Sequence, residues 1–217
     1  MTKKMKRDRK ILVITTILCL LPIVFSLTVY DRLPEEVAVH WNMEGEANGY
    51  ASKEFAVFGL PLFLAFINII VNISTEADPK RKNTSDKVKL ILKFLVPIMS
   101  LLLNPITILI ALGKEISVGS IVSILVGVLF IVIGNYMPKC KQNYTIGIRN
   151  PWTLCDEDNW NRTHHMAGYL YIIGGILFLL TPFFPVFVNF AIAYIIIFMV
   201  FAPYVYSYIL YRKSMKH

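Results

Sequence analysis

The chain has 217 residues and a formal net charge of +8; 56% of its residues are hydrophobic and only 17% are charged. This apolar share exceeds that of soluble globular domains and excludes that class, so the composition indicates an integral membrane protein. The excess positive charge is explained by basic residues that meet anionic lipid at the ends of membrane helices, and we expect no direct contact with nucleic acid.

Six apolar runs are long enough to cross a bilayer core of about 30 Å, which takes roughly 20 helical residues. None of them contains Asp, Glu, Lys, Arg or His. The last two runs are joined only by Val188, so one long broken helix is an alternative, but Pro182 and Pro185 favour a tight turn between two spans. We therefore predict an all-α polytopic protein, with residues 1–217 as a single membrane domain. The runs are Ile11 to Tyr30, Phe55 to Ser74, Phe94 to Leu112, Ile116 to Met137, Ala167 to Phe187 and Asn189 to Tyr211.

The first run follows the basic segment MTKKMKRDRK, an arrangement that a signal peptide shares. The sequence after the run, VFSLTVYDR, offers no good small-x-small cleavage site, and the run is long enough to span. We expect an uncleaved membrane anchor.

Basic residues near helix ends resist translocation, so their distribution predicts the orientation of the spans. With the amino terminus inside, 19 of the 22 Lys and Arg residues fall on the cytoplasmic side and three, namely Arg32, Lys53 and Lys114, fall outside. We therefore expect both termini to be cytoplasmic. This orientation makes residues 31–54 an extracytoplasmic loop and residues 138–166 a cytoplasmic loop.

The outer loop, residues 31–54, has features of a folded segment. The stretch from Val37 to Asn42 alternates with the two-residue period of a short strand, and Asn48-Gly49 is a turn signal. Six acidic residues against two basic ones make the loop negative, which would attract a cationic peptide or metal ion to its surface. The competing interpretation is that a positive-inside topology leaves acidic residues outside. For Trp41 and Tyr50, an aromatic belt at the membrane surface is the competing interpretation.

The inner loop, residues 138–166, concentrates polar and aromatic side chains. Pro151 should hold Asn150 in an extended conformation, and a helix should begin at Thr153 or Asp156. Trp160 and the histidine four residues later would share one face of that helix. Arg149 has two candidate partners, a carboxylate of the Asp156–Asp158 run or lipid phosphate, and a lipid-surface position is the competing interpretation for Trp152 and Trp160.

Both loops resemble one known family. The segment LPEEVAVHWNMEGEANGY carries the pattern L-P-x-x-V-x-x-H-W-N, and NYTIGIRNPWTLCDEDNWNRTHHMAG carries the pattern I-G-I-R-x-P-W-T-L. In this order and with six spans, the two patterns resemble those of the SdpI family of bacterial multi-span membrane proteins. Three positions depart from the family pattern: Asn150 replaces Thr, Cys155 replaces Ser and His165 replaces a basic residue.

The resemblance implies that the chain is a multi-pass immunity protein of the bacterial inner membrane, which protects a bacterium from its own secreted peptide toxin. It further implies signalling, because the best-described member captures a cytoplasmic transcriptional repressor at the membrane. The toxin-sensing candidates in the outer loop are His40, Trp41, Asn42, Gly45 and Tyr50. The partner-binding candidates in the inner loop are Arg149, Pro151, Trp152, Thr153, Trp160 and His164. Motion of the spans that hold Gly127, Gly134, Gly174 and Gly175 is a candidate link between the loops.

Two other classes of protein compete with this interpretation. A transporter usually keeps an ionisable group inside a span, and the six runs contain none. Asn68, Asn72 and Asn104 could line a small polar cavity, but hydrogen bonds between packed helices are the expected role. An enzyme would need a nucleophile with a base, or a metal cluster, and the sequence offers neither, so we expect no catalytic residue, metal site or cofactor. The thiols and imidazoles of the inner loop lack metal-binding spacing.

Overall fold

The computed structural model describes residues 3–42 and 45–215, and within them six helices are long and apolar enough to cross a membrane. The predicted number of spans is confirmed. A short 3₁₀ turn, Thr181–Phe183, separates the last two helices, so the alternative of one broken helix is wrong. The helices are α1 (Lys3–Thr28), α2 (Leu60–Ala77), α3 (Asp86–Ala111), α4 (Val118–Tyr136), α5 (Pro151–Cys155), α6 (Glu157–Leu180) and α7 (Pro185–Ser214), and the strands are β1 (Glu36–Trp41) and β2 (Ala47–Ser52).

Several helices begin earlier than hydropathy predicts, and α3 and α6 show why. Helix α3 begins at Asp86 rather than Phe94, and α6 begins at Glu157 rather than Ala167. Both early segments carry polar side chains that are buried, such as Lys93 and His164. A prediction from hydropathy places polar residues outside the apolar runs, so it misses these helical turns. The apolar runs themselves hold no ionisable residue, but the helices α3 and α6 extend beyond their runs and include ionisable side chains.

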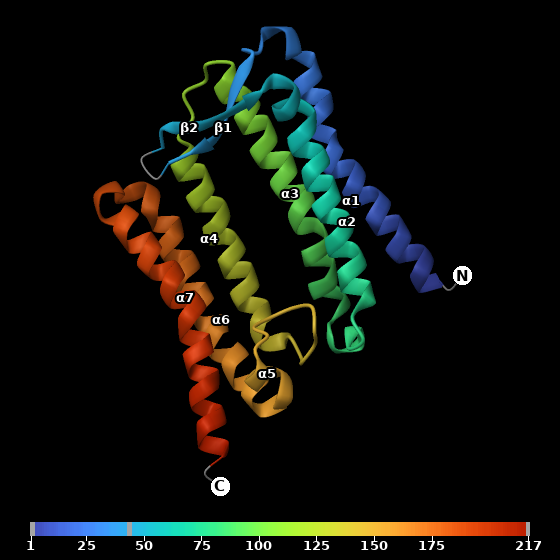
Figure 1. Ribbon diagram of the computed structural model, residues 1–217, viewed down its shortest axis with the longest axis vertical. Helices are drawn as coiled ribbons and strands as arrows, with labels where there is room; N and C mark the ends of the chain where they lie inside the picture. Colours follow the sequence, from blue (N-terminus) through green and yellow to red (C-terminus); the bar gives the residue numbers. More distant parts are fainter. Residues whose placement is uncertain (1–2, 43–44, 216–217) are drawn as a thin grey trace. The chain divides into compact units, whose positions relative to one another are not determined.

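The chain divides into two compact units, which we describe separately. The amino-terminal unit comprises Met1–Ala77 and Lys89–Ser117. In it α1, α2 and α3 run side by side, and the hairpin of β1 and β2 lies at the end where α1 leads toward α2 (Figure 1). Leu33 of the loop packs on Val57 and Ile108, which fixes the base of the hairpin to the helix ends.

The interior of the amino-terminal unit is polar. The side-chain amide of Asn68 on α2 lies 3.1 Å from Oγ1 of Thr15 on α1. Asn104 on α3 donates to the carbonyl of Ala56 at 3.2 Å, and Ser100 donates to the carbonyl of Cys19 at 2.8 Å. The expected hydrogen bonds between helices are thus present for Asn68 and Asn104, and they set which helix faces meet.

A buried ion pair closes one end of this interior. The ammonium group of Lys93 lies 2.8 Å from Glu76 of α2 and 3.6 Å from Asp8 of α1, and its side chain is only 3% exposed. A buried ammonium group needs such partners because an unpaired buried charge is costly. Since the two carboxylates balance it, helix packing accounts for Lys93 without a transport role.

The carboxy-terminal unit comprises Asp78–Val88 and Val118–His217, and α6 packs in it against both α4 and α7. Glycines bring α4 and α6 together: a Cβ atom added to Gly127 would lie 2.8 Å from the carbonyl oxygen of Gly175, and one added to Gly134 would lie 2.7 Å from that of Gly168. Close backbone approach explains these glycines. Their role in motion stays a prediction.

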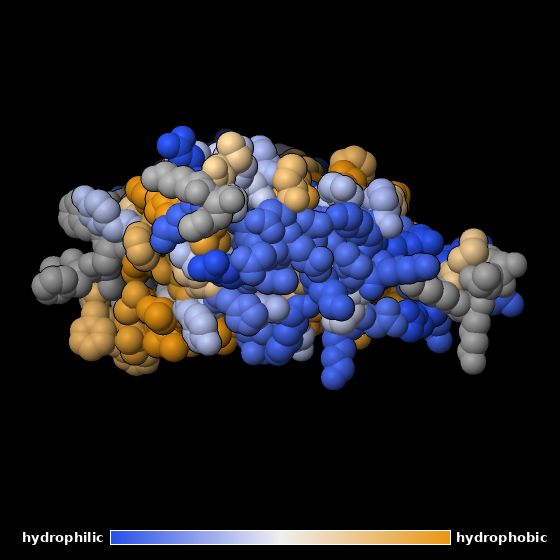
Figure 2. Space-filling view, turned by 90° about the horizontal axis from the view of Figure 1, so that it is seen from below, coloured by the Kyte–Doolittle hydropathy of each residue, from blue (hydrophilic) through white to orange (hydrophobic). Residues whose placement is uncertain are grey.

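Polar and apolar residues occupy different areas of the surface, as expected for a membrane protein. Figure 2 looks at the molecule from below and shows hydrophilic residues over most of that face, with hydrophobic residues toward its margins. Many large apolar side chains on the helices are exposed, among them Tyr194 on α7 and Phe66 on α2, at 71% and 58%. Exposed side chains of this kind suit contact with lipid rather than with water.

Candidate functional site

The outer hairpin presents one face to the surroundings and packs the other against the helices. Val37 is 1% exposed, whereas His40 and Tyr50 point outward, and Tyr50 is 59% exposed. Nδ1 of His40 lies 2.6 Å from Oδ1 of Asn48 across the two strands. Of the toxin-sensing candidates, His40, Gly45 and Tyr50 are therefore exposed, and Trp41 and Asn42 are half-buried.

The turn of the hairpin differs from the prediction. Asn48 and Gly49 lie inside β2, so the Asn-Gly turn signal is wrong, and the chain reverses between Trp41 and Ala47. The backbone N–H of Glu46 donates to Oδ1 of Asn42 at 2.8 Å, and Gly45 has a φ of +83°, a conformation that favours glycine. Gly49 is needed for another reason, because a Cβ there would lie 2.9 Å from Cβ of His40 where the register of the strands is irregular.

An ion pair and a hydrogen bond to a carboxylate stabilise the two ends of the outer loop. Lys53 pairs with Glu35 at 2.7 Å, and the hydroxyl of Tyr30 donates to Glu54 at 2.9 Å. The pKa of Glu54 is lowered, mainly by a hydrogen bond from its own backbone N–H and also by the hydrogen bond from the hydroxyl of Tyr30. This carboxylate is therefore ionised at neutral pH. Glu36 and Glu46 are exposed and add negative charge to the surface of the hairpin.

In the carboxy-terminal unit, the segment from Cys140 to Asn150 folds around a buried asparagine. Oδ1 of Asn143 accepts the backbone N–H groups of Thr145 and Ile146 at 2.9 and 2.6 Å, and its Nδ2 donates to the carbonyl of Lys141. Asparagine side chains commonly stabilise turns in this way. The bend that the sequence predicts before α5 therefore begins several residues earlier, at a position that no family pattern marks.

Trp160 and His164 form the core against which this segment packs. Their rings are stacked with centroids 4.0 Å apart, which confirms that they share one face of α6. Nε1 of Trp160 donates to the carbonyl of Cys140 at 2.7 Å. Because the exposed fractions of Trp160 and His164 are 0% and 1%, a lipid-surface position for Trp160 is wrong.

The hydrogen bonds of His164 define its protonation state. Nε2 accepts the backbone N–H of Ile148 at 3.0 Å and therefore carries no proton. Nδ1 lies 2.8 Å from the carbonyl of Trp160, so it must be the nitrogen that donates. The neutral ring is thus a structural bridge from α6 to the IGIR segment.

Helix α5 begins with a capping box. Oδ1 of Asn150 accepts the backbone N–H of Thr153 at 2.9 Å, and Oγ1 of Thr153 accepts the backbone N–H of Asn150 at 3.1 Å. Asn150 is extended, as Pro151 predicts, and its Nδ2 donates to Ser207 of α7 at 2.7 Å. A helix start at Thr153 is wrong because the helix begins at Pro151, whereas Asp156 does cap α6, as predicted. The Asn-Pro pair was the missed signal, since Asn caps well and Pro suits the first helical position.

The partner-binding candidates fall into two groups. Thr153, Trp160 and His164 are buried, so they support the loop from inside rather than touch a partner. Arg149 and Pro151 are exposed and Trp152 is half-buried, with its ring 5.0 Å from that of Tyr208 on α7. The guanidinium group of Arg149 donates to the carbonyl of Tyr144 at 2.5 Å, not to the predicted carboxylates.

The segment before α3 supports the loop from a second side. The carboxylate of Asp78 accepts the backbone N–H groups of Lys80 and Tyr144 at 2.7 and 3.0 Å. The side chain of Gln142 accepts from Lys80 and donates to the carbonyls of Thr153 and Leu154. Sequence reasoning missed Asp78 and Gln142, since their partners lie far away along the chain.

No titratable cluster suggests catalysis within the described ranges 3–42 and 45–215. They contain no group of three or more His, Cys, Asp or Glu side chains that could hold a metal ion. Several of the ionisable residues named above, such as Lys53, Asp78 and Lys93, are engaged in pairs or backbone contacts that hold loops and helices.

Comparisons with known proteins agree with the motif resemblance. Residues 139–210 match the SdpI/YfhL protein family, and residues 17–65 match a domain of unknown function designated DUF1648. The chain is 29% identical over 177 residues to the immunity protein SdpI of Bacillus subtilis (strain 168), covering 79% of this chain and 81% of the relative. No solved structure matches the chain. The resemblance is confirmed, and with its six apolar helices the chain is a multi-pass protein of the bacterial cell membrane.

Proposed function

The chain is a relative of the SdpI family, and from this premise we propose that it is an immunity protein that protects its cell from a secreted peptide toxin. The observation that carries the proposal is the alignment with an immunity protein over four fifths of both chains. The relative is an immunity protein rather than an enzyme, and we assign no catalytic step to this chain.

We further propose that the outer hairpin recognises the toxin. Its outward face combines an imidazole and an aromatic ring, His40 and Tyr50, with the exposed carboxylates of Glu36 and Glu46. Aromatic side chains supply most of the energy at many interfaces, and negative charge raises the rate at which a cationic peptide arrives. The hairpin is held by strand pairing and the Leu33 cluster, so recognition would cost little ordering entropy.

The experiment is to delete the gene in the parent bacterium and challenge the cells with the medium of a parent culture. The deletion strain should stop growing or lyse, and a plasmid copy of the gene should restore growth. Unchanged growth of the deletion strain in medium that kills an unrelated sensitive strain would contradict the immunity function.

A second activity, capture of a cytoplasmic repressor, is proposed for the exposed part of the inner loop. Arg149 offers a guanidinium group and Trp152 a large aromatic ring, and Pro151 between them fixes how they are presented. Trp152 also packs on α7, so its removal changes both the fold and the surface. Arg149 gives the cleaner test, because its side chain is exposed and donates to a backbone carbonyl, that of Tyr144.

The Arg149→Ala variant should keep toxin protection and lose toxin-dependent crosslinking to a cytoplasmic protein. The expected loss of partner affinity is on the order of 1 to 4 kcal/mol. Lys141→Ala, an exposed cation in the same loop, is the matched control. If Arg149→Ala and Lys141→Ala crosslink to the cytoplasmic protein to the same extent, the repressor proposal is contradicted. The immunity proposal is not affected by that result.

A further inference from the structure

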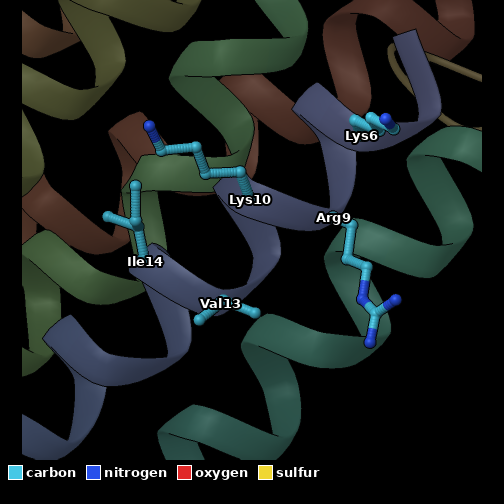
Figure 3. A pocket seen from close by; sticks show the side chains of 5 residues that line it. All are labelled: Lys6, Arg9, Lys10, Val13 and Ile14. Carbon is cyan, nitrogen blue, oxygen red and sulfur yellow. The ribbon is translucent and has the colours of Figure 1, made fainter. Parts of the chain in front are cut away.

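The first turns of α1 carry an open groove whose lining changes from cationic to apolar along the helix. Lys6, Arg9, Lys10, Val13 and Ile14 line this groove, which has a volume of about 590 Å³. Figure 3 shows these five side chains projecting from successive turns of α1, with Lys10 and Ile14 next to each other. The spacing of three and four residues places them along one broad face of the helix.

The groove is positive because the nearby carboxylate is turned away from it. Asp8 is the only acidic residue between Lys3 and Ile14, and it reaches Lys93 of α3 at 3.6 Å with a side chain that is 17% exposed. Among the residues that the structure describes, no carboxylate pairs with Lys6, Arg9 or Lys10. Three exposed cations therefore line the groove, and no carboxylate in the described part of the chain pairs with them.

The other end of the groove is suited to hydrocarbon. Val13 and Ile14 are 50% and 39% exposed, and they lie on a helix that is apolar enough to span a membrane from Met5 to Thr28. Three residues separate Lys10 from Val13, a rise of about 4.5 Å along the axis. The change from cationic to apolar lining thus occurs within one helical turn.

We propose that this groove binds one anionic diacyl phospholipid. Its phosphodiester would lie among Lys6, Arg9 and Lys10, and one acyl chain would run along Val13 and Ile14. A phospholipid has the same order of charge and hydrocarbon over the same short length, whereas a free phosphate ion would use only the cationic half. The proposal does not depend on the immunity function.

The test is native mass spectrometry of the full-length protein, purified in detergent and mixed with equal amounts of phosphatidylglycerol and phosphatidylcholine that carry identical acyl chains. The wild type should retain phosphatidylglycerol in preference to phosphatidylcholine. The triple variant Lys6→Gln, Arg9→Gln, Lys10→Gln should lose that preference by about 100-fold, since it removes three cations that attract an anionic headgroup. The single variant Arg9→Gln should show a smaller loss, and it serves if the triple variant does not fold.

The matched control is Lys82→Gln, Lys87→Gln, Lys213→Gln, which removes the same charge from exposed positions outside the groove. It should keep the preference of the wild type. Equal loss in the control would mean that net charge alone attracts the lipid, and displacement of the lipid by millimolar inorganic phosphate would mean a site for small anions. Either result, or equal retention of both lipids by the wild type, would overturn the proposal.

Discussion

Nε2 of His164 accepts the backbone N–H of Ile148 at 3.0 Å, which joins the first turns of α6 to the IGIR segment sixteen residues earlier. The same ring donates through Nδ1 to the carbonyl of Trp160 and stacks on the indole of that residue. One neutral histidine thus fixes the loop that presents Arg149 and Trp152.

Replacing His164 with Phe should destabilise the protein, because a ring of similar shape keeps the stacking but leaves the buried N–H of Ile148 without an acceptor. The expected loss is about 1 to 3 kcal/mol of unfolding free energy. Denaturation in detergent, followed by circular dichroism, measures it. His165→Phe, at the exposed neighbouring position, is the control, and an equal loss in both variants would show that the bridge contributes nothing.

Replacing Gly147 with Ala should also destabilise this loop. Gly147 has a φ of +101°, and an added Cβ would clash with Nε2 of His164. Backbone strain of this kind costs about 1 to 3 kcal/mol. Gly119→Ala on α4 meets open space and should be neutral or slightly stabilising, so similar denaturation curves for the two variants would contradict the geometry.

Acid should weaken the support of the loop through Asp78. Burial alone would raise the pKa of Asp78, but hydrogen bonds from Thr145 and from the backbone of Lys80 and Tyr144 outweigh it, and the pKa is lowered. Because the folded state holds the carboxylate ionised, its stabilisation is present above about pH 4, the pKa in the unfolded chain, and is lost as pH falls through the lower folded pKa.

Unfolding midpoints measured in detergent from pH 7 down to pH 3 test this dependence. Asp78→Asn should be less stable than the wild type at pH 7, and the gap should narrow as the pH falls. A gap that stays constant over this range would show that ionisation of Asp78 does not support the fold.

The six spans and the two polar loops could be predicted because hydropathy and charge are local properties of the sequence. The early starts of α3 and α6 could not, since Lys93 and His164 look like solvent-exposed residues until their distant partners Glu76 and Ile148 are known. The hairpin turn was misplaced because Gly49 serves a close approach to His40 rather than a turn. The family patterns marked both Arg149 and Trp160 as partner-binding candidates. Only the structure shows that Arg149 is exposed and Trp160 is buried.

The native cysteines offer a direct test of the predicted orientation. Cys155 is exposed, Cys140 and Cys19 are buried, and burial raises the pKa of the Cys140 thiol, so only Cys155 should react readily with a maleimide. A membrane-impermeant maleimide should label Cys155 in disrupted cells but not in intact ones.

The matched variant carries Glu36→Cys in the hairpin together with Cys155→Ser. It should be labelled in intact cells, because the outer loop is expected outside. If instead Cys155 is labelled in intact cells and the hairpin cysteine is not, the inner loop faces outward and the hairpin faces the cytoplasm. That result would contradict both the toxin-sensing and the repressor-capture proposals.

Toxin protection by a hairpin variant is the most direct measurement of the central claim, that this hairpin recognises a toxin. Trp41→Ala with Tyr50→Ala should lower the toxin concentration that cells survive by tenfold or more, since about 1.4 kcal/mol of lost binding free energy has that effect. Tyr194→Ala, which removes an exposed aromatic ring on α7, should protect as the wild type does at equal membrane levels. Full protection by the hairpin variant at a matched membrane level would contradict the account.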